Sequence, residues 1–306
     1  MKRLLHIVDS FDYIKGNCFQ HQLQHALYGL NDWVVDTISY TNLDRLTRGV
    51  GAYDSIVSCL KQRTLFRESA MLKHRLGDAP ITVYDQDPWQ AYMDDSPYRG
   101  AYEHIASHLN VKTFAVTTKW WCDFVNDRGL PSTFVRMWVL PNYCHRGLTF
   151  EQRKGPGFVG SLHPRRKMLV DMCNSAGIQM NVLSGNALPY EQFLSALSSL
   201  SIFVHNEDMP IFIDGKEYNF NTGMWVKDIE ALARGCYSIR SKASGHETYL
   251  AGLESAVLYD DIRQVPDIIN GINNMDPDVR QASIDKAVKA IEGAHVWHET
   301  ASILVD

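Results

Sequence analysis

The 306 residues carry 45% hydrophobic and 21% charged side chains. This is the balance of an ordinary globular protein, and it excludes a disordered, a collagen-like and a disulfide-dense chain. At ~100–200 residues per domain, the length predicts two domains of similar size. The formal net charge of −5 excludes a general positive field for a phosphate polymer or an anionic membrane. Any basic site must therefore be local.

The six cysteines are widely spaced and form no CxxC pair, which argues against a disulfide framework and against a zinc ribbon. We therefore expect reduced thiols and a cytoplasmic protein. After Met1 the chain offers only Leu4–Val8 as an apolar run before Asp9, which is too short for a signal peptide. No stretch reaches the ~18–20 apolar residues of a membrane helix, so we expect no integral membrane segment.

The first half alternates short apolar runs with longer amphipathic ones, as strands and helices do when they follow each other in turn. The expected strands are Leu4–Val8, Val34–Ser39, Ser55–Leu60, Ile81–Tyr84, Thr113–Thr117 and Phe134–Leu140. Between the first two, Asn17–Leu30 has its apolar residues at spacings of three and four, which predicts a helix. Such alternation predicts an α/β fold with a parallel, doubly wound sheet, because parallel neighbours need a crossover connection.

The rhythm pauses at Pro141–Tyr143 and the polar stretch Glu151–Pro156, and then resumes. The later strands are expected at Met180–Leu183, Ile202–His205, Cys236–Ile239 and Ala256–Tyr259. We therefore predict two Rossmann-like domains that face each other across a cleft: an N-terminal domain of residues 1–143, a linker of 144–156 and a C-terminal domain of 157–306. The prediction leaves open whether the last helix crosses back to the N-terminal domain. Ligands of such sheets bind beyond the carboxyl ends of the strands.

The first strand of the second half is expected where the rhythm resumes, at Gly157–Gly160, and a local basic segment follows it. This segment opens a helix, with Pro164 at the first helical position. Its residues are Gly160, Ser161, Leu162, His163, Pro164, Arg165, Arg166 and Lys167. Backbone amides at a helix start, the helix dipole and three adjacent cations together suit a diphosphate. The alternative is a basic segment that only solvates the start of the helix.

A second candidate is the segment Asn221–Cys236, which is typical of a capped helix with Thr222 as its cap and Gly235 as its stop. Lys227 and Glu230 lie three residues apart and share one face. The carboxylate can accept hydrogen bonds from a ribose diol, while the lysine and the helix start address phosphate. The alternative is a surface ion pair, although the apolar neighbours of Glu230 indicate partial burial.

A third candidate follows the expected strand Ile81–Tyr84. On an extended chain Asp85 and Asp87 point to one side and Gln86 to the other. We favour Asp87 as the group that orients an acceptor hydroxyl. The alternative is that Asp87 caps a turn before Pro88.

Two further features receive a structural interpretation. The segment Asn206–Phe220 is long for a connection, and we favour a surface hairpin over a lid. His163 and His246 fall on expected loops, but no spacing resembles a metal triad, so we predict no metal site.

With these motifs in order, the C-terminal half resembles the nucleotide-sugar-binding domain of glycosyltransferases with the GT-B fold, especially the retaining families and the CgeB-like spore-maturation group. The matching segments are Val139–Asn142, Phe158–Ser161, Leu183–Gly185, Tyr190–Phe193, Leu200–Val204, Asp228–Gly235, Ser244–Glu247 and Trp297–Ala301. The stretch around Asp87 is similar to the segment of retaining phage DNA glucosyltransferases and CgeB-like proteins that carries a His-Asp pair. Gln86 stands in place of the histidine.

The resemblance implies a hexosyl- or pentosyltransferase that moves a sugar from a nucleotide-diphosphate sugar to an acceptor hydroxyl, with retention of configuration. The implied catalytic residues are Asp87, Arg165 and Arg166. The implied donor-binding residues are Gly16, Gly160, Ser161, His163, Lys167, Thr222, Gly223, Lys227, Glu230, Gly245, His246 and Glu247. The nucleotide sugar is the donor substrate, and no metal or other cofactor is expected to be obligatory, because preorganised cations can stabilise the leaving diphosphate.

Two departures from the family pattern stand out. Thr222 occupies the place where many retaining members have a second glutamate, and the glycine-rich first turn is reduced to Asp12–Asn17, which keeps Gly16. The sequence leaves the identity of the acceptor open: it is a glycan, a protein, a small molecule or a modified DNA base. A nucleotide-sugar epimerase and a non-catalytic nucleotide-sugar-binding protein are alternatives on the same fold.

Overall fold

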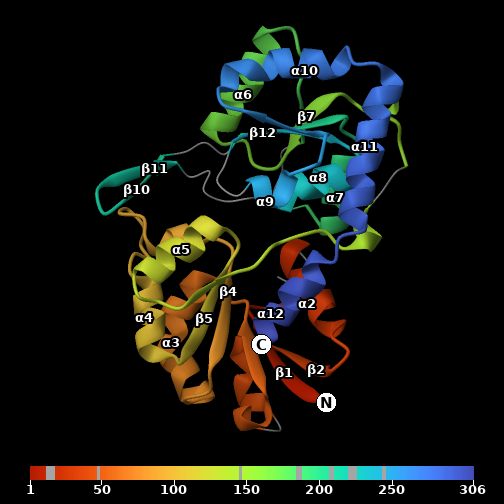
Figure 1. Ribbon diagram of the computed structural model, residues 1–306. Coiled ribbons are helices and arrows are strands. Elements are labelled where there is room, and N and C mark those ends of the chain that lie inside the picture. Colours follow the sequence, from red (N-terminus) through yellow and green to blue (C-terminus); the bar gives the residue numbers. More distant parts are fainter. Residues whose placement is uncertain are drawn as a thin grey trace. The chain divides into compact units, whose positions relative to one another are not determined.

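The computed structural model describes residues 1–11, 18–46, 49–144, 147–183, 188–206, 210–219, 226–242 and 246–306. Contacts divide the chain into two units. The first consists of Met1–Met137, Pro210–Tyr218 and His295–Asp306, and the second of Trp138–Met209 and Asn219–Ala294. Each unit is built around one larger sheet (Figure 1). The segment 144–156, expected to be a linker, lies within the second unit.

The sheet of the first unit has six parallel strands in the order β2-β1-β3-β4-β5-β6. The strands are β1 (Lys2–Val8), β2 (Trp33–Ser39), β3 (Ser55–Ser58), β4 (Ile81–Asp85), β5 (Val111–Val116) and β6 (Ser132–Phe134). Every residue of β3 and β4 is buried, because helices cover both faces of a parallel sheet. The order is that of a doubly wound sheet whose ligand crevice opens at the carboxyl ends of β1 and β3.

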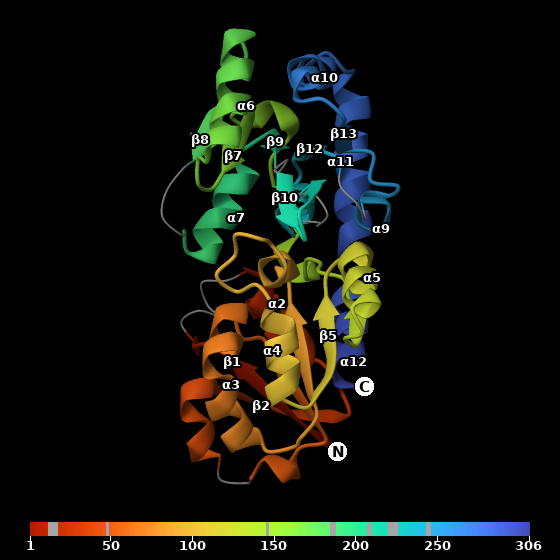
Figure 2. The ribbon, with the colours of Figure 1, turned by 90° about the vertical axis from the view of Figure 1, so that its left-hand side faces the viewer.

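Helices of the first unit lie on both faces of its sheet. They are α2 (Cys18–Tyr28), α3 (Gln62–Leu76), α4 (Ala101–His108), α5 (Lys119–Asp127) and α12 (Val296–Val305), with the short turns η1 (Tyr40–Arg45), η2 (Val50–Ala52) and η3 (Pro88–Ala91). α3 packs beside α4 on one face, and α12 packs beside α2 on the other (Figures 1 and 2). The last helix of the chain therefore completes the first unit.

A hairpin from the later part of the chain also belongs to the first unit. It consists of β10 (Pro210–Ile213) and β11 (Lys216–Asn219). The amide nitrogens of Asp214 and Gly215 donate to the two carboxylate oxygens of Asp94, each at 2.9 Å. The Asp214 carboxylate in turn accepts from the guanidinium groups of Arg99 at 2.9 Å and Arg128 at 2.7 Å. The hairpin expected between residues 206 and 220 is therefore present.

The second unit repeats the same plan with a five-stranded parallel sheet in the order β13-β12-β9-β7-β8. Its strands are β7 (Pro156–Val159), β8 (Asn181–Leu183), β9 (Ile202–His205), β12 (Tyr237–Ser241) and β13 (Ala256–Tyr259). Counted along the chain, this is the same doubly wound order as in the first unit. The expectation of an α/β fold with parallel sheets is confirmed.

The second unit has helices around its sheet, with buried apolar side chains between them. The helices are α6 (Pro164–Ser175), α7 (Tyr190–Ser198), α8 (Val226–Ala233), α9 (His246–Leu250), α10 (Val265–Asn273) and α11 (Pro277–Glu292), with the turns η4 (Pro141–Tyr143), η5 (Phe150–Gln152) and η6 (Ile262–Gln264). α6 contacts α10, and α8 contacts both α7 and α11. One core holds Phe158, Leu197 and Phe203. α8 ends before Gly235, whose φ of 80° permits the left-handed turn expected there.

One expected strand was wrong in its position. β6 is Ser132–Phe134, and Val135–Leu140 is not a strand. The apolar run arises because Val135, Met137 and Val139 are buried in an irregular segment. Within the described part of the chain, no helix combines the length and the apolar character needed to cross a bilayer. The cysteines at 59, 122, 144, 173 and 236 are free thiols.

Candidate active site

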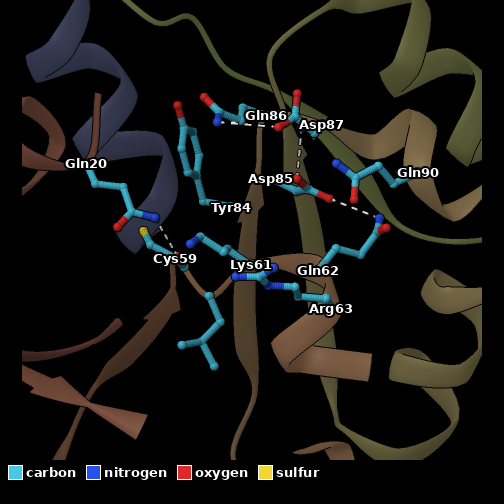
Figure 3. Close-up of a pocket in the computed structure, with 11 residues that line it drawn as sticks. Gln20, Cys59, Lys61, Gln62, Arg63, Tyr84, Asp85, Gln86, Asp87 and Gln90 are labelled. Atoms are coloured by element: carbon cyan, nitrogen blue, oxygen red, sulfur yellow. Dashed lines mark hydrogen bonds between the residues drawn. The ribbon is translucent and has the colours of Figure 1, made fainter. Parts of the chain in front are cut away.

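A pocket of about 260 Å³ opens at the carboxyl edge of the first sheet (Figure 3). We call it the glutamine pocket, because four of its lining side chains are glutamines. It is lined by Gln20, Cys59, Leu60, Lys61, Gln62, Arg63, Tyr84, Asp85, Gln86, Asp87 and Gln90. Most of these residues end or follow β3 and β4 or begin α3, and Gln20 comes from α2. They gather where a doubly wound sheet binds its ligands.

Asp85 at the end of β4 is buried and surrounded by donors. Its Oδ1 accepts from the amide of Asp87 at 2.9 Å, and its Oδ2 accepts from the Tyr102 hydroxyl at 2.9 Å and from Nε2 of Gln62 at 3.3 Å. Burial raises the pKa of Asp85, and these three donors offset part of the increase. Its bonds fix the loop after β4, so Asp85 is a positioning residue.

Asp87 is the partly exposed carboxylate of the pocket. The indole nitrogen of Trp89 donates to its Oδ1 at 3.2 Å, and Nε2 of Gln86 approaches its Oδ2 at 3.5 Å. Burial and the neighbouring Asp85 carboxylate raise the pKa of Asp87 to about 7, against the pull of the two donors. A carboxylate with this pKa changes its protonation state near neutral pH, as a group that exchanges protons with a hydroxyl must. Asp87 precedes η3 without a side-chain bond to its helical start.

The cations of the pocket stand at the start of α3, where an acidic residue already lies. Oδ2 of Asp9 accepts from the amide of Lys61 at 2.9 Å, and its Oδ1 accepts from the Thr64 hydroxyl at 2.6 Å. Burial lowers the pKa of Lys61, and Asp9 offsets part of that decrease. The carboxylate of Asp9 therefore fills the position that a bound anion would take at this helix start.

In the second unit, the structure brings two predicted donor residues together. Gly160 directly follows β7 and has φ 134°, a backbone conformation that favours glycine. A Cβ at this position would lie 3.2 Å from Cζ of Phe158 and 3.5 Å from Nζ of Lys227. The Lys227 ammonium group therefore stands beside the backbone at the carboxyl end of β7, although 67 positions separate the two residues in the chain.

The basic segment after β7 divides into exposed and buried side chains. Ser161, His163 and Lys167 are exposed and Arg165 is partly exposed, whereas Arg166 is buried. The Arg166 guanidinium donates to the carbonyl oxygen of Ser161 at 2.8 Å and lies 4.6 Å from the centre of the Phe158 ring. Arg166 thus holds the loop that starts α6, a role that adjacent arginines in the sequence do not reveal.

α8 carries Glu230 on its buried side. The Glu230 side chain is fully buried, and its Oε1 accepts from the Tyr190 hydroxyl at 3.0 Å. Tyr190 begins α7. The burial that the apolar neighbours of Glu230 indicated is therefore complete, and the alternative of an exposed Lys227–Glu230 ion pair does not apply.

Asp228 on the same helix is the centre of a buried polar cluster that sequence reasoning missed. It accepts from Nδ1 of His205 at 3.1 Å, from the Ser238 hydroxyl at 3.0 Å and from the Arg240 guanidinium at 2.7 Å. Burial acts to raise the pKa of Asp228, but Arg240 and His205 outweigh it and the pKa is lowered. The partners lie on β9 and β12, so the cluster ties the start of α8 to the sheet. Their wide spacing left no local signal.

Several predicted site residues lie outside the described residues: Gly16, Thr222, Gly223 and Gly245. His246 and Glu247 begin α9, and their side chains are likewise outside the description. The glutamines of the pocket were not predicted, apart from Gln86 as a neighbour of Asp87. Their shared feature, a place just after a strand of the first sheet or at the start of its helices, was the available signal. The described ranges hold no group of three or more His, Cys, Asp or Glu side chains able to bind a metal.

Comparisons with known proteins identify the fold. No protein-family model matches the chain, and no curated protein matches it in sequence. Anabaena HepE, solved in complex with UDP and glucose, superposes with a TM-score of 0.68 at 11% identity over 99% of both chains. An alpha-glucosyltransferase solved with UDP-glucose and DNA containing an abasic site gives 0.68 at 9% identity, also over 99% of both. Sucrose-phosphate synthase from Thermosynechococcus elongatus gives 0.64 at 12% identity over 99% of this chain and 97% of that one. The chain has the GT-B fold of these proteins.

Proposed function

We propose that the protein is a glycosyltransferase that moves a sugar from a nucleoside-diphosphate sugar to an acceptor hydroxyl. The observation that carries the proposal is Asp87, a carboxylate with a pKa near 7 in a polar pocket at the carboxyl edge of the first sheet. The fold adds support, because solved proteins with the same fold include HepE with UDP and an alpha-glucosyltransferase with UDP-glucose. Fold alone does not fix an activity.

In the proposed reaction, Asp87 orients the acceptor. Its ionised carboxylate accepts a hydrogen bond from the acceptor hydroxyl, which directs an oxygen lone pair toward the sugar carbon and raises the nucleophilicity of that oxygen. The side chains of Trp89 and Gln86 donate hydrogen bonds to the Asp87 carboxylate and so fix its orientation. Asp85 fixes the backbone amide of Asp87. The geometry of the hydroxyl is thus set before the bond to the sugar forms.

The second unit supplies the proposed donor site. Cleavage of the anomeric bond leaves negative charge on the diphosphate, which Arg165, Lys167 and Lys227 stabilise together with the amides that begin α6. Gly160 lets the diphosphate approach the backbone, since it has no Cβ. Glu230 accepts hydrogen bonds from the ribose, with Tyr190 holding its other oxygen. Ser161 and His163 line the same loop.

Predicted residues whose side chains lie outside the described residues are also part of the proposed donor site. Thr222 and Gly223 precede α8, and Gly245, His246 and Glu247 surround the start of α9; we assign them to the donor sugar. We also assign Gly16, which follows β1 in the chain, to donor binding. We also propose that the sugar keeps its anomeric configuration, which proton NMR of the purified product would decide by the coupling constant of the anomeric proton.

Calorimetry with nucleoside diphosphates and a transfer assay with radiolabelled UDP-glucose test the function. We expect the wild type to bind UDP and to release it from UDP-glucose in the presence of an acceptor. Asp87→Asn should keep the UDP affinity but lose transfer, while the control Asp95→Asn, on an exposed position of the same unit, should change neither. An Asp87→Asn protein with full transfer activity contradicts the role of Asp87. A wild type that binds no nucleoside diphosphate contradicts the function.

A further inference from the structure

We infer that the acceptor is an uncharged carbohydrate, one sugar ring of which binds in the glutamine pocket, and that it is not a nucleic acid. The inference rests on the proposed function, because it names the substrate class of the acceptor side. Three observations carry it: the chemistry of the lining side chains, the distribution of charge at the start of α3, and the size of the pocket.

The lining is rich in neutral groups that both donate and accept hydrogen bonds. Four glutamine amides surround the pocket, and an amide can satisfy either the hydrogen or the oxygen of a hydroxyl without adding charge. Gln62 is the clearest case. It is 5% exposed and donates to Asp85 at 3.3 Å, while its Oε1 accepts no hydrogen bond from the described part of the chain. A buried carbonyl oxygen in this state is costly to leave unpaired, and a sugar hydroxyl supplies the missing donor.

Two further amides stand on the loop after β4. Gln86 and Gln90 flank Asp87 in sequence, both are partly exposed, and both line the pocket. Figure 3 shows Gln86 above Asp85 and Gln90 beside it, with the ring of Tyr84 on the side of Gln86. Because the Tyr84 ring is 2% exposed, the amides of Gln86 and Gln90 are the groups that address the hydroxyls of a sugar here.

The charges around the pocket oppose a phosphate backbone. Lys61 and Arg63 are the lining cations, but Asp9 already accepts from the Lys61 amide, and Asp85 and Asp87 add two acidic groups. In the sequence of the first unit, Asp and Glu outnumber Lys and Arg. Nucleic-acid binding draws its affinity from several Lys and Arg contacts to phosphates. The observed balance does not provide them.

The volume of the pocket limits how many sugar rings it can hold. Its volume of about 260 Å³ falls just below the range of about 300–1,000 Å³ that holds drug-sized ligands. One sugar ring fits this space, and the rest of a longer carbohydrate would extend outside. The ring would present a hydroxyl to Asp87, the partly exposed carboxylate of the lining.

Saturation-transfer NMR on the full chain tests the inference, with UDP present. The probes are methyl glycosides of common hexoses and pentoses at about 10 mM, a concentration that detects weak binding, and in parallel a 13-mer duplex DNA at about 50 mM salt, where phosphate contacts are strong. We expect a saturation-transfer signal from at least one glycoside, which shows that it binds, and no binding of the DNA. Gln62→Leu and Gln90→Leu should each weaken glycoside binding about 5- to 10-fold, the effect of one lost hydrogen bond. Gln24→Leu, on α2 and outside the pocket lining, is the matched control and should not change it.

The outcomes separate the inference from the function on which it rests. DNA binding without glycoside binding overturns the inference, and so does an absence of binding by every glycoside while UDP still binds. Unchanged glycoside affinity in Gln90→Leu, whose partly exposed position tolerates leucine, places the sugar elsewhere and also overturns it. If UDP does not bind in the same samples, the proposed donor site is contradicted. The glycoside result still tests the glutamine pocket, because it is measured separately.

Discussion

The hydroxyl of Tyr190 donates a hydrogen bond of 3.0 Å to Oε1 of Glu230, and both side chains are buried within the second unit. The bond joins the first residue of α7 to the middle of α8. It fixes the carboxylate that we assign to the ribose of the donor.

Removal of this hydroxyl tests the assignment. Tyr190→Phe should lower the free energy of unfolding by about 1 kcal/mol and weaken UDP binding severalfold, because the Glu230 carboxylate loses its fixed orientation. Urea unfolding and calorimetry measure the two effects. Tyr28→Phe, which removes an exposed hydroxyl bonded to Thr37, is the control and should leave UDP affinity unchanged. Equal UDP affinity in both variants would contradict a donor role for Glu230.

The pKa of Asp87 predicts the pH dependence of transfer. Because the ionised form is the active one and its pKa is raised to about 7, the transfer rate should rise as pH increases through 7 and level off above it. Asp87→Asn should lower the rate by about 10²–10⁴-fold and abolish this rise. Rates measured from pH 5 to about 9 would show it. A wild-type profile that is flat across neutrality counts against the assignment.

The same raised pKa has a consequence for stability. The folded protein holds the Asp87 proton more tightly than the unfolded chain does, so the contribution of the protonated form is greatest below the unfolded pKa of 3.8 and is lost as pH rises to about 7. Asp87→Asn should therefore gain stability relative to wild type as pH rises over this window. Thermal unfolding of Asp87→Asn and of the wild type across this window measures the difference between them.

The buried pair of Asp228 and Arg240 should be far more sensitive than an exposed pair. Arg240→Met leaves the Asp228 carboxylate buried without its main cation and should cost about 3–5 kcal/mol. Lys242→Met breaks the exposed pair with Asp260 and should cost about 1 kcal/mol or less. The double change Asp228→Asn with Arg240→Met should cost less than the sum of the single changes, because the two residues interact. Urea unfolding measures all three.

A methyl group at Gly160 should damage both stability and donor binding. In Gly160→Ala the Cβ meets Phe158 at 3.2 Å, and φ of 134° is unfavourable for alanine. We expect a loss of about 1–3 kcal/mol and weaker UDP binding. Gly51→Ala, where nothing lies within 4 Å of the added Cβ, is the control. Calorimetry showing full UDP affinity in a folded Gly160→Ala protein would remove Gly160 from the donor site.

The hairpin should depend on Asp214. Asp214→Asn keeps a side chain that tolerates the observed φ of 53° but removes the ion pairs with Arg99 and Arg128. We expect faster hydrogen exchange over residues 210–218 and a loss of about 1 kcal/mol or less, because the pairs are exposed. Glu217→Gln should leave exchange unchanged. If the two variants exchange alike, the ion pairs do not hold the hairpin.

The sequence predicted the elements of the fold well where periodicity decides them. The strands Ile202–His205 and Ala256–Tyr259 and the helix that starts at Pro164 have the expected bounds. The exception is Phe134–Leu140, whose apolar residues are buried without forming a strand. An apolar run reports burial, and it does not report whether backbone hydrogen bonds to a neighbouring strand exist.

The site could be predicted only in part. The edge of the sheet located Asp85 and Asp87, and we favour Asp87, but the alternation of an extended chain alone places both on one side. In the structure Asp85 is enclosed by Tyr102 and Gln62, while Asp87 remains partly exposed. This difference depends on partners 17 and 23 residues away. For the same reason, Arg166 could not be distinguished from Arg165 before its contact with Phe158 was seen.

The first unit gathers three separate stretches of the chain, since the β10–β11 hairpin and α12 belong to the same unit as residues 1–137. A ribosome finishes this unit only when the final helix has emerged, after the entire second unit has been synthesised. A fragment that stops at Met137 would leave bare the sheet face that α12 covers. An isolated first unit must therefore be supplied with that helix, either by fusion or as a separate peptide.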